Sequence, residues 1–230
     1  MFNVLKVIFL IFLKMKFFDF HHHHPEIKFG IYNLKFGETS PETLFSAGIH
    51  PDSISEKLEE HFLWLNEISK NRNCVAIGEC GLDGLIDVEE KLQEEVFEMQ
   101  IILANEIQKP LIIHCVKRFS QLIHFKKISK VPMIIHGFNK RKTIGDDLLK
   151  HDFYLSFGKS VLHNVNLQDF VKDFPIEKMF LETDSANFEI EDLYGKVAEL
   201  KNLTLEEFNE KIQKNLHFLN IPLQNEEKLA

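Results

Sequence analysis

The sequence predicts an α/β fold of the (β/α)8 TIM-barrel type, compact and with shortened loops. Its 230 residues suit a single domain of ordinary size. Short apolar runs of strand length alternate with longer stretches of helical spacing, which indicates parallel βαβ units. A doubly wound open sheet would show the same alternation, but nearly every strand run here ends in His, Glu or Asp. Because a barrel gathers the carboxyl ends of its strands on one face, we predict a barrel.

In chain order, the predicted strands are short apolar runs separated by longer segments. They cover residues 16–20, 44–48, 75–78, 111–114, 133–136, 154–157 and 179–182. Helices are predicted where apolar residues recur on one face, over residues 55–70, 88–107 and 204–219. Thr204, with Glu207 three residues later, fits a capping box at the start of the last of these helices.

The chain divides into an apolar start, one domain and a polar tail. Residues 1–14 contain an unbroken apolar core of seven residues, far shorter than the roughly 20 that span a bilayer. We expect an upstream extension that need not be native, with translation starting at Met15; a membrane tether or an extra packed element are the alternatives. No stable membrane span is predicted. Neither a repeat nor a linker interrupts residues 15–222, which are predicted to form the barrel, with residues 223–230 as a polar tail.

The chain is acidic, with 35 Asp and Glu against 27 Lys and Arg and a formal net charge of -8. Proteins that coat nucleic acid use a broad basic face, so this balance argues against that class. The three cysteines form no CxxC pair, which disfavours a zinc ribbon and a disulfide framework and suggests a reducing compartment. We expect a cytoplasmic monomer.

Six side chains at strand ends have the types and places that metal ligands need. His21 and His23 are separated by one residue, so on a strand both point to the same side and can bind one cation. Glu79 follows the run 75–78, and a carboxylate there can bridge two ions. The remaining three close further runs: His114, His136 and Asp184.

Imidazole and carboxylate ligands together suit Zn²⁺, Mn²⁺ or Mg²⁺. Two such ions about 3.5–4 Å apart can activate a water and stabilise the leaving oxygen of a phosphodiester, and an Asp beside that water can act as general base. A single His at a strand end is more often structural than a ligand, and a surface acid is usually only solvated. Six such groups falling together at strand ends favour the metal site.

Several short motifs along the chain are distinctive. AIGECGLD at residues 76–83 is the most specific, DFHHH at 19–23 opens the domain, and LETD at 181–184 follows the last strand run. Shorter segments of the same kind are GIHP, PLIIHC and IHGF, at residues 48–51, 110–115 and 135–138. Together, from about Phe18 to Leu219, they resemble the motifs of the TatD-related metal-dependent deoxyribonucleases, a family of the amidohydrolase-like barrel superfamily.

The resemblance implies a barrel that hydrolyses phosphodiester bonds in DNA, typically from the 3′ end, with single strands or 3′ ends as the substrate. The implied ligands of a first divalent ion are His21, His23, Glu79 and Asp184. The implied ligands of a second are Glu79, His114 and His136. Glu79 and Asp184 are then the catalytic residues, and His50 faces the substrate.

Departures from the family motifs fall in the loops that bind substrate and leave the metal ligands intact. The family usually carries Arg directly after H-C, where this chain has Val116. Lys117 and Arg118 follow and are the candidate residues for binding phosphate. After LETD the chain continues with SANF at residues 185–188, where the family has a small residue and then Pro.

Two other functions stay open from the sequence. A barrel amidohydrolase acting on a small amide, lactone or phosphoester would keep the metal site, although such barrels often carry a carboxylated Lys where this chain has Glu79. A non-catalytic barrel that binds a metal or a partner would be expected to lack a ligand, and none is missing. The acidic charge does not exclude a nuclease, because two divalent ions would bring positive charge into the cleft.

Overall fold

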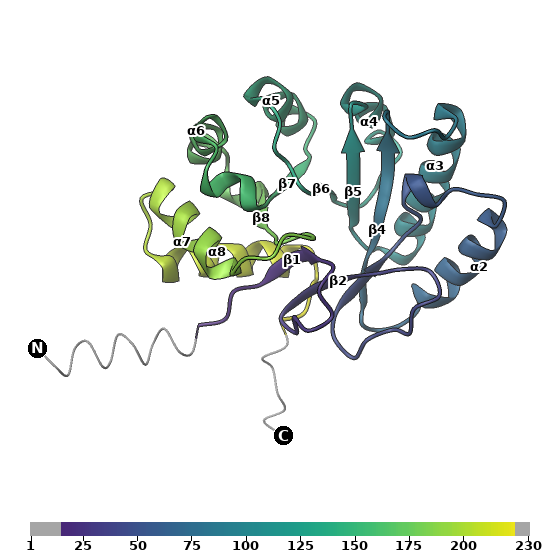
Figure 1. Ribbon diagram of the computed structural model, residues 1–230, viewed down its shortest axis with the longest axis horizontal. Helices are drawn as coiled ribbons and strands as arrows, with labels where there is room; N and C mark the ends of the chain where they lie inside the picture. Colours follow the sequence, from purple (N-terminus) through teal and green to yellow (C-terminus); the bar gives the residue numbers. More distant parts are fainter. Residues whose placement is uncertain (1–14, 224–230) are drawn as a thin grey trace, which may run out of the picture.

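In the computed structural model, which describes residues 15–223, eight parallel strands form one sheet in sequential order (Figure 1). The strands are β1 (Asp19–His22), β2 (Gly30–Leu34), β3 (Phe45–Ala47), β4 (Cys74–Asp83), β5 (Leu111–Val116), β6 (Met133–Ile135), β7 (Tyr154–Phe157) and β8 (Met179–Leu181). The predicted extension 1–14 lies outside the described residues, as does all but the first residue of the predicted tail 223–230.

The first and last strands are held together, so that the barrel is nearly closed. A bridge pairs His22, at the end of β1, with Asp184, which follows β8. The Asp184 N–H donates to the carbonyl oxygen of His21 at 2.9 Å, and the His23 N–H donates to the carbonyl oxygen of Asp184 at 3.1 Å. The predicted TIM-barrel class is therefore confirmed.

Helices follow most of the strands along the chain and lie around the sheet (Figure 1). They are α2 (Leu58–Ile68), α3 (Glu90–Ile107), α4 (Phe119–Phe125), α5 (Lys142–Lys150), α6 (Val165–Asp173), α7 (Ile190–Leu200) and α8 (Leu205–Phe218), with 3-10 turns η1 (Pro51–Ser53), η2 (Lys159–Leu162) and η3 (Ile176–Lys178). No helix separates β1 from β2 or β2 from β3, in agreement with the shortened loops. Within residues 15–223, no helix combines the length and apolar character that a membrane crossing requires.

The predicted strands differ from the observed ones mainly at their ends. Strand 154–157 is confirmed, whereas the strand predicted at 75–78 extends over Cys74–Asp83. Its continuation includes Gly81, which still pairs with β5. β2, with the sequence GIYNL, is absent from the prediction because its apolar residues are few and a polar Asn interrupts them. This omission matters, since β2 carries a residue of the site.

The three predicted helices are confirmed as α2, α3 and α8, each shortened by a few residues. The capping box at the start of α8 is also confirmed: the Thr204 hydroxyl accepts from the Glu207 N–H at 3.2 Å, and the Glu207 carboxylate accepts from the Thr204 N–H at 2.8 Å. These reciprocal bonds satisfy two backbone N–H groups that would otherwise lack partners at the helix start.

Buried aromatic rings and one buried acid join the first strand of the barrel to the last. Phe20 of β1 stacks on Phe180 of β8 with ring centroids 4.1 Å apart. Beside them, the Asp19 carboxylate accepts hydrogen bonds from the Thr183 N–H at 2.9 Å and the Thr183 hydroxyl at 2.6 Å. Burial raises the pKa of Asp19 to about 7, against the opposing effect of these hydrogen bonds. The ends of β1 and β8 are thereby fixed where the functional residues begin.

Candidate metal centre

The six predicted ligands converge at the carboxyl ends of the strands, around the carboxylate of Glu79. Its Oε2 lies 3.3 Å from Nε2 of His23 and 3.6 Å from Nε2 of His21. Its Oε1 lies 2.8 Å from Nε2 of His136 and 3.8 Å from Nδ1 of His114. One carboxylate therefore faces two separate pairs of histidines, one with each oxygen.

Asp184 completes the side of the site that faces Oε2. Its Oδ1 lies 3.3 Å from Nε2 of His23 and 4.0 Å from Nε2 of His21. Asp184 has a φ of 55°, in the left-handed region that residues other than glycine seldom adopt. Its backbone is held there by the hydrogen bonds with His21 of β1 and with His23, which follows β1, and these fix the direction of its side chain.

Glycines place Glu79 by letting β4 approach its neighbour. Gly78 has a φ of 155°, and a Cβ at this position would collide with the carbonyl oxygen of Ile112 on β5. Gly81 likewise leaves no room for a Cβ beside the carbonyl oxygen of His114. The close approach of β4 and β5 thus brings Glu79 and His114 to one edge of the barrel, and it requires glycine on both sides of Glu79.

Three polar residues that the sequence did not assign to the site contact its candidate ligands. The Asn33 amide on β2 donates to Oε2 of Glu79 at 2.7 Å, and the Glu79 N–H donates to Oδ1 of Asn33 at 3.2 Å. Asp83 lies at the end of β4, with its Oδ2 3.0 Å from Nε2 of His114. Such outer contacts fix the ring orientation of a ligating histidine and leave its other nitrogen to face the ion.

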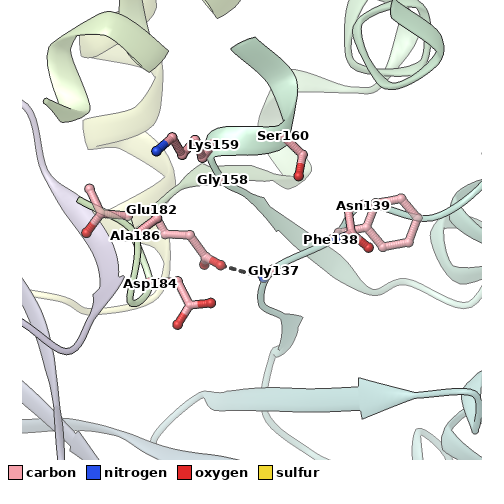
Figure 2. A pocket seen from close by; sticks show the side chains of 10 residues that line it. Gly137, Phe138, Asn139, Gly158, Lys159, Ser160, Glu182, Asp184 and Ala186 are labelled. Atoms are coloured by element: carbon pink, nitrogen blue, oxygen red, sulfur yellow. Dashed lines mark hydrogen bonds between the residues drawn. The ribbon is translucent and has the colours of Figure 1, made fainter. Parts of the chain in front are cut away.

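Glu182 is the third of these residues and is fully buried. Its Oε1 accepts from the Gly137 N–H at 2.5 Å (Figure 2). The same oxygen lies 3.5 Å from Nδ1 of His136. Asp83 and Glu182 lie inside the motifs AIGECGLD and LETD, so the sequence contained a signal for both. Asn33 lies outside every motif that the sequence analysis identified, and nothing there indicates its role.

The charges of the site are strongly coupled. Hydrogen bonds to Asp184 and Glu79 raise the pKa of His23 to about 9. Burial alone would lower the pKa of His136, but the charge of Glu79 raises it well above its ordinary value. Burial alone would likewise raise the pKa of Glu79, but His136 and the other histidines hold it well below its ordinary value. The buried carboxylate and the histidines around it thus favour each other's charged forms.

A divalent cation fits this set of donors. His21 is fully buried, and neither of its ring nitrogens has a hydrogen-bond partner within residues 15–223. A buried polar atom without a hydrogen-bond partner destabilises a protein unless a bound ion or molecule contacts it. Nε2 of His21 faces the carboxylates of Glu79 and Asp184, so a cation between these groups would contact all three. Three groups of donors have ligand atoms that all lie within 4.8 Å of one another inside the group, and two of them include His21: His21–His23–Glu79 and His21–His136–Asp184. A third joins His50, Glu79 and His114.

The three predicted substrate-binding residues occupy different environments. His50 is half-buried, and its ring centroid lies 4.3 Å from that of His114. Lys117 is exposed in the loop after β5. Arg118 is buried, and its guanidinium lies 2.6 Å from Glu94 and 3.1 Å from Glu90, both on α3. His50 is thus beside the candidate ligands, whereas the charge of Arg118 is directed to α3.

A cavity of about 170 Å³ opens beside Asp184 (Figure 2). It is lined by residues of the loops that follow β6, β7 and β8, among them Asn139, Lys159 and Ser160. Cys80 and Cys115, near the site in sequence, are buried free thiols. Burial raises the pKa of Cys115 to about 12 and that of Cys80 further, so neither supplies a thiolate nucleophile at neutral pH.

The chain is similar to one family of known proteins and to several individual relatives. The family model described as TatD related DNase matches residues 30–219. An uncharacterized metal-dependent hydrolase of Bacillus subtilis is 33% identical over 179 residues, which cover 70% of this chain and 70% of that protein. A protein of Rahnella named 3′-5′ ssDNA/RNA exonuclease TatD is 28% identical over 183 residues, which cover 73% of this chain and 67% of that protein.

Solved structures show the same architecture. The crystal structure of YjjV, a TatD homologue from Escherichia coli K12, superposes with a TM-score of 0.75. The match covers 90% of this chain and 98% of that protein, at 18% sequence identity. At that identity the likeness shows the fold alone, and it agrees with the barrel described above.

Proposed function

Because the chain belongs to the TatD related DNase family of metal-dependent hydrolases, we propose that it removes nucleotides from the 3′ end of single-stranded DNA. The observation that carries this proposal is the position of Glu79, whose two carboxylate oxygens face different pairs of histidines. This is the arrangement that a hydrolytic site with two divalent ions needs. The relative named as an exonuclease on single strands supports the choice of substrate.

The residues at the centre fit two divalent ions, Mg²⁺, Mn²⁺ or Zn²⁺. We propose as ligands of the first ion His21, His23, Glu79 and Asp184. We propose as ligands of the second Glu79, His114 and His136. When bound, such ions polarise the phosphoryl oxygens and make a water more acidic.

Asp184 is the residue that we propose as the general base. Its side chain is 39% exposed and lines the cavity, whereas Glu79 is buried between the histidines. A water oxygen forms a bond to phosphorus, the bond from phosphorus to the leaving oxygen breaks, and Asp184 accepts one proton of the water. The leaving oxygen takes a proton from solvent, so that the products are a phosphomonoester and an alcohol.

The three residues predicted to bind substrate have two different roles in this proposal. His50, beside His114, and the exposed Lys117 contact the substrate. Arg118 acts on the position of Lys117, because its ion pairs with Glu90 and Glu94 anchor the loop to α3. We also propose that the protein is a monomer and that it works in the cytoplasm, a reducing compartment that suits its free cysteines.

The test uses the purified full chain and a 5′-labelled single-stranded oligonucleotide with Mn²⁺ or Mg²⁺. The expected result is a ladder of products that shortens from the 3′ end, and its loss with Glu79→Ala and with Asp184→Ala. Glu177→Ala, an exposed change in η3, is the control and keeps full activity. Undiminished cleavage by both site variants would rule out this assignment. Hydrolysis of small amides or lactones without cleavage of DNA would favour the amidohydrolase.

A further inference from the structure

Positive charge is unevenly distributed among the loops at the carboxyl ends of the strands. The loops after β5, β6 and β7, at residues 117–118, 136–141 and 158–164, contain Lys and Arg and no Asp or Glu. The loops after β3 and β4, at residues 48–57 and 84–89, each contain two acids. Arg118 is neutralised by acids of α3, whereas the other Lys and Arg residues of these loops form no ion pair with a carboxylate within residues 15–223. In a chain with a net charge of -8, one sector of the catalytic face is therefore basic.

The first cavity reaches from the metal centre into this basic sector. Asp184 and Lys159 both line it, and Figure 2 shows them on opposite sides. Lys159 is exposed, and its Nζ lies 5.9 Å from the centroid of the Phe188 ring. It forms no ion pair with a carboxylate within residues 15–223. Its ammonium is thus available to a phosphate close to the candidate base.

A second cavity, of about 470 Å³, lies beside the first. The two share one lining residue, Asn139. The second lies between α5 and α6, and at the start of α5 it is lined by Lys140, Arg141 and Lys142. Lys142 lies 3.4 Å from Asp146, whereas Lys140 and Arg141 form no ion pair with a carboxylate in the described part of the chain.

The second cavity also has acids, but they lie away from the catalytic face. Asp169 and Asp173 line it and belong to the later turns of α6. Because α5 and α6 start at the carboxyl ends of β6 and β7, the basic residues lie at the end nearer the metal centre. Asn164 and Asn166, at the start of α6, offer amides on the opposite wall. An extended anion that enters from the metal centre meets cations first and is repelled further down.

We propose that these two cavities form one path for the substrate strand, which runs from the metal centre past Lys159 to Lys140 and Arg141. This proposal rests on the proposed nuclease function and specifies where its substrate lies. Lys159 binds the phosphate nearest the scissile bond, and Lys140 with Arg141 binds phosphates further towards the 5′ end. Cations along such a path contribute affinity by releasing counterions, so their effect grows with the number of phosphates bound.

The proposal is tested by binding that depends on the length of the strand. Fluorescence anisotropy with Mn²⁺ is measured for a thymidine dinucleotide and an octanucleotide with the protein carrying Asp184→Asn, which is expected to slow turnover about 10²- to 10⁴-fold. The variants are Lys159→Ala and the double change Lys140→Ala/Arg141→Ala. The matched control is Lys150→Ala/Lys172→Ala, which removes the same charge from exposed residues at the other ends of α5 and α6.

The double variant is expected to weaken binding of the octanucleotide about tenfold and to change that of the dinucleotide less than about twofold. Its salt dependence should fall in slope by about 1.4, the value for two phosphate contacts on a single strand. Lys159→Ala should weaken the binding of both the dinucleotide and the octanucleotide. The path would be overturned if the double variant lost the same affinity for the dinucleotide as for the octanucleotide, or if the control variant lost as much affinity as the double variant.

Failure of the path and failure of the nuclease give different results. Cleavage by the unmodified protein with no effect of Lys140→Ala/Arg141→Ala on either ligand refutes the path and leaves the nuclease. Length-dependent binding that is lost in this variant, without cleavage by the unmodified protein under any metal, supports the path and refutes the nuclease.

Discussion

Glu182→Gln tests whether Glu182 orients the candidate ligand His136, because it changes this contact and leaves every candidate ligand in place. Glu182 is fully buried, and its Oε1 both accepts from the Gly137 N–H and faces Nδ1 of His136 at 3.5 Å. The amide oxygen of Gln can still accept from Gly137, so the loop after β6 keeps its anchor. Its neutral oxygen attracts the ring N–H of His136 less, so the imidazole loses part of its orientation and of its basicity.

The expected magnitude depends on this contact. Loss of an outer partner of a ligating histidine costs about 10- to 100-fold in metal affinity, or about 1.4–2.7 kcal/mol. Because no solvent screens Glu182, we expect the upper part of this range. The loss should fall on the ion that His136 binds, while the ion beside His23 changes by less than about threefold.

Calorimetric titration of the metal-free protein with Mn²⁺ measures both affinities. The expected trace keeps its first step and moves the second to higher metal concentration. Glu199→Gln, an exposed change on α7 whose carboxylate pairs with Lys196, is the control and leaves both steps unchanged. Two unchanged steps with Glu182→Gln would refute the reasoning that Glu182 supports His136.

The remaining predictions concern catalysis, two glycines and one buried thiol. Asp184→Asn should lower kcat for single-stranded DNA by about 10²- to 10⁴-fold in steady-state assays, with binding of the octanucleotide largely retained. Gly78→Ala should lower the free energy of unfolding in urea by about 3 kcal/mol, because the added Cβ would collide with the backbone of Ile112. Gly195→Ala, in α7 with open space around it, should instead stabilise by about 0.5–1 kcal/mol; destabilisation there would contradict the assignment of open space. Burial raises the pKa of Cys74 from 9.0 to about 11, so the unfolded chain loses this proton first. The stability of the protein relative to Cys74→Ala should therefore be constant below pH 9 and fall by up to about 1.4 kcal/mol per pH unit between pH 9 and 11; a flat difference would contradict this.

The barrel could be predicted because its strands end in polar residues that only a convergent face would use. The run 154–157 was bounded by changes in polarity, and the structure has the strand there. β2 was missed because a strand of five residues with Asn33 inside it has no clear apolar pattern. β4 is longer than predicted because glycine usually interrupts a strand, whereas Gly78 and Gly81 permit its close pairing with β5.

The candidate ligands were visible in the sequence because each lies at a predictable place on its strand. Their supporting contacts were not, because they join residues far apart in the chain. Asn33 and Glu79 are separated by 46 positions, and only the barrel brings them together. Arg118 illustrates the same limit: its place after β5 suggested a phosphate contact, but the packing of α3 supplies Glu94 as its partner. The sequence specifies residue types, and the fold decides which charges are already neutralised.

The Glu79 carboxylate, on this interpretation, divides one site between two divalent ions. Anomalous diffraction from crystals soaked in Mn²⁺ tests this division most directly. We predict two peaks about 3.5–4 Å apart, one beside His21 and His23 and one beside His114 and His136. A single peak away from Glu79, or no peak among these histidines at saturating Mn²⁺, would contradict it.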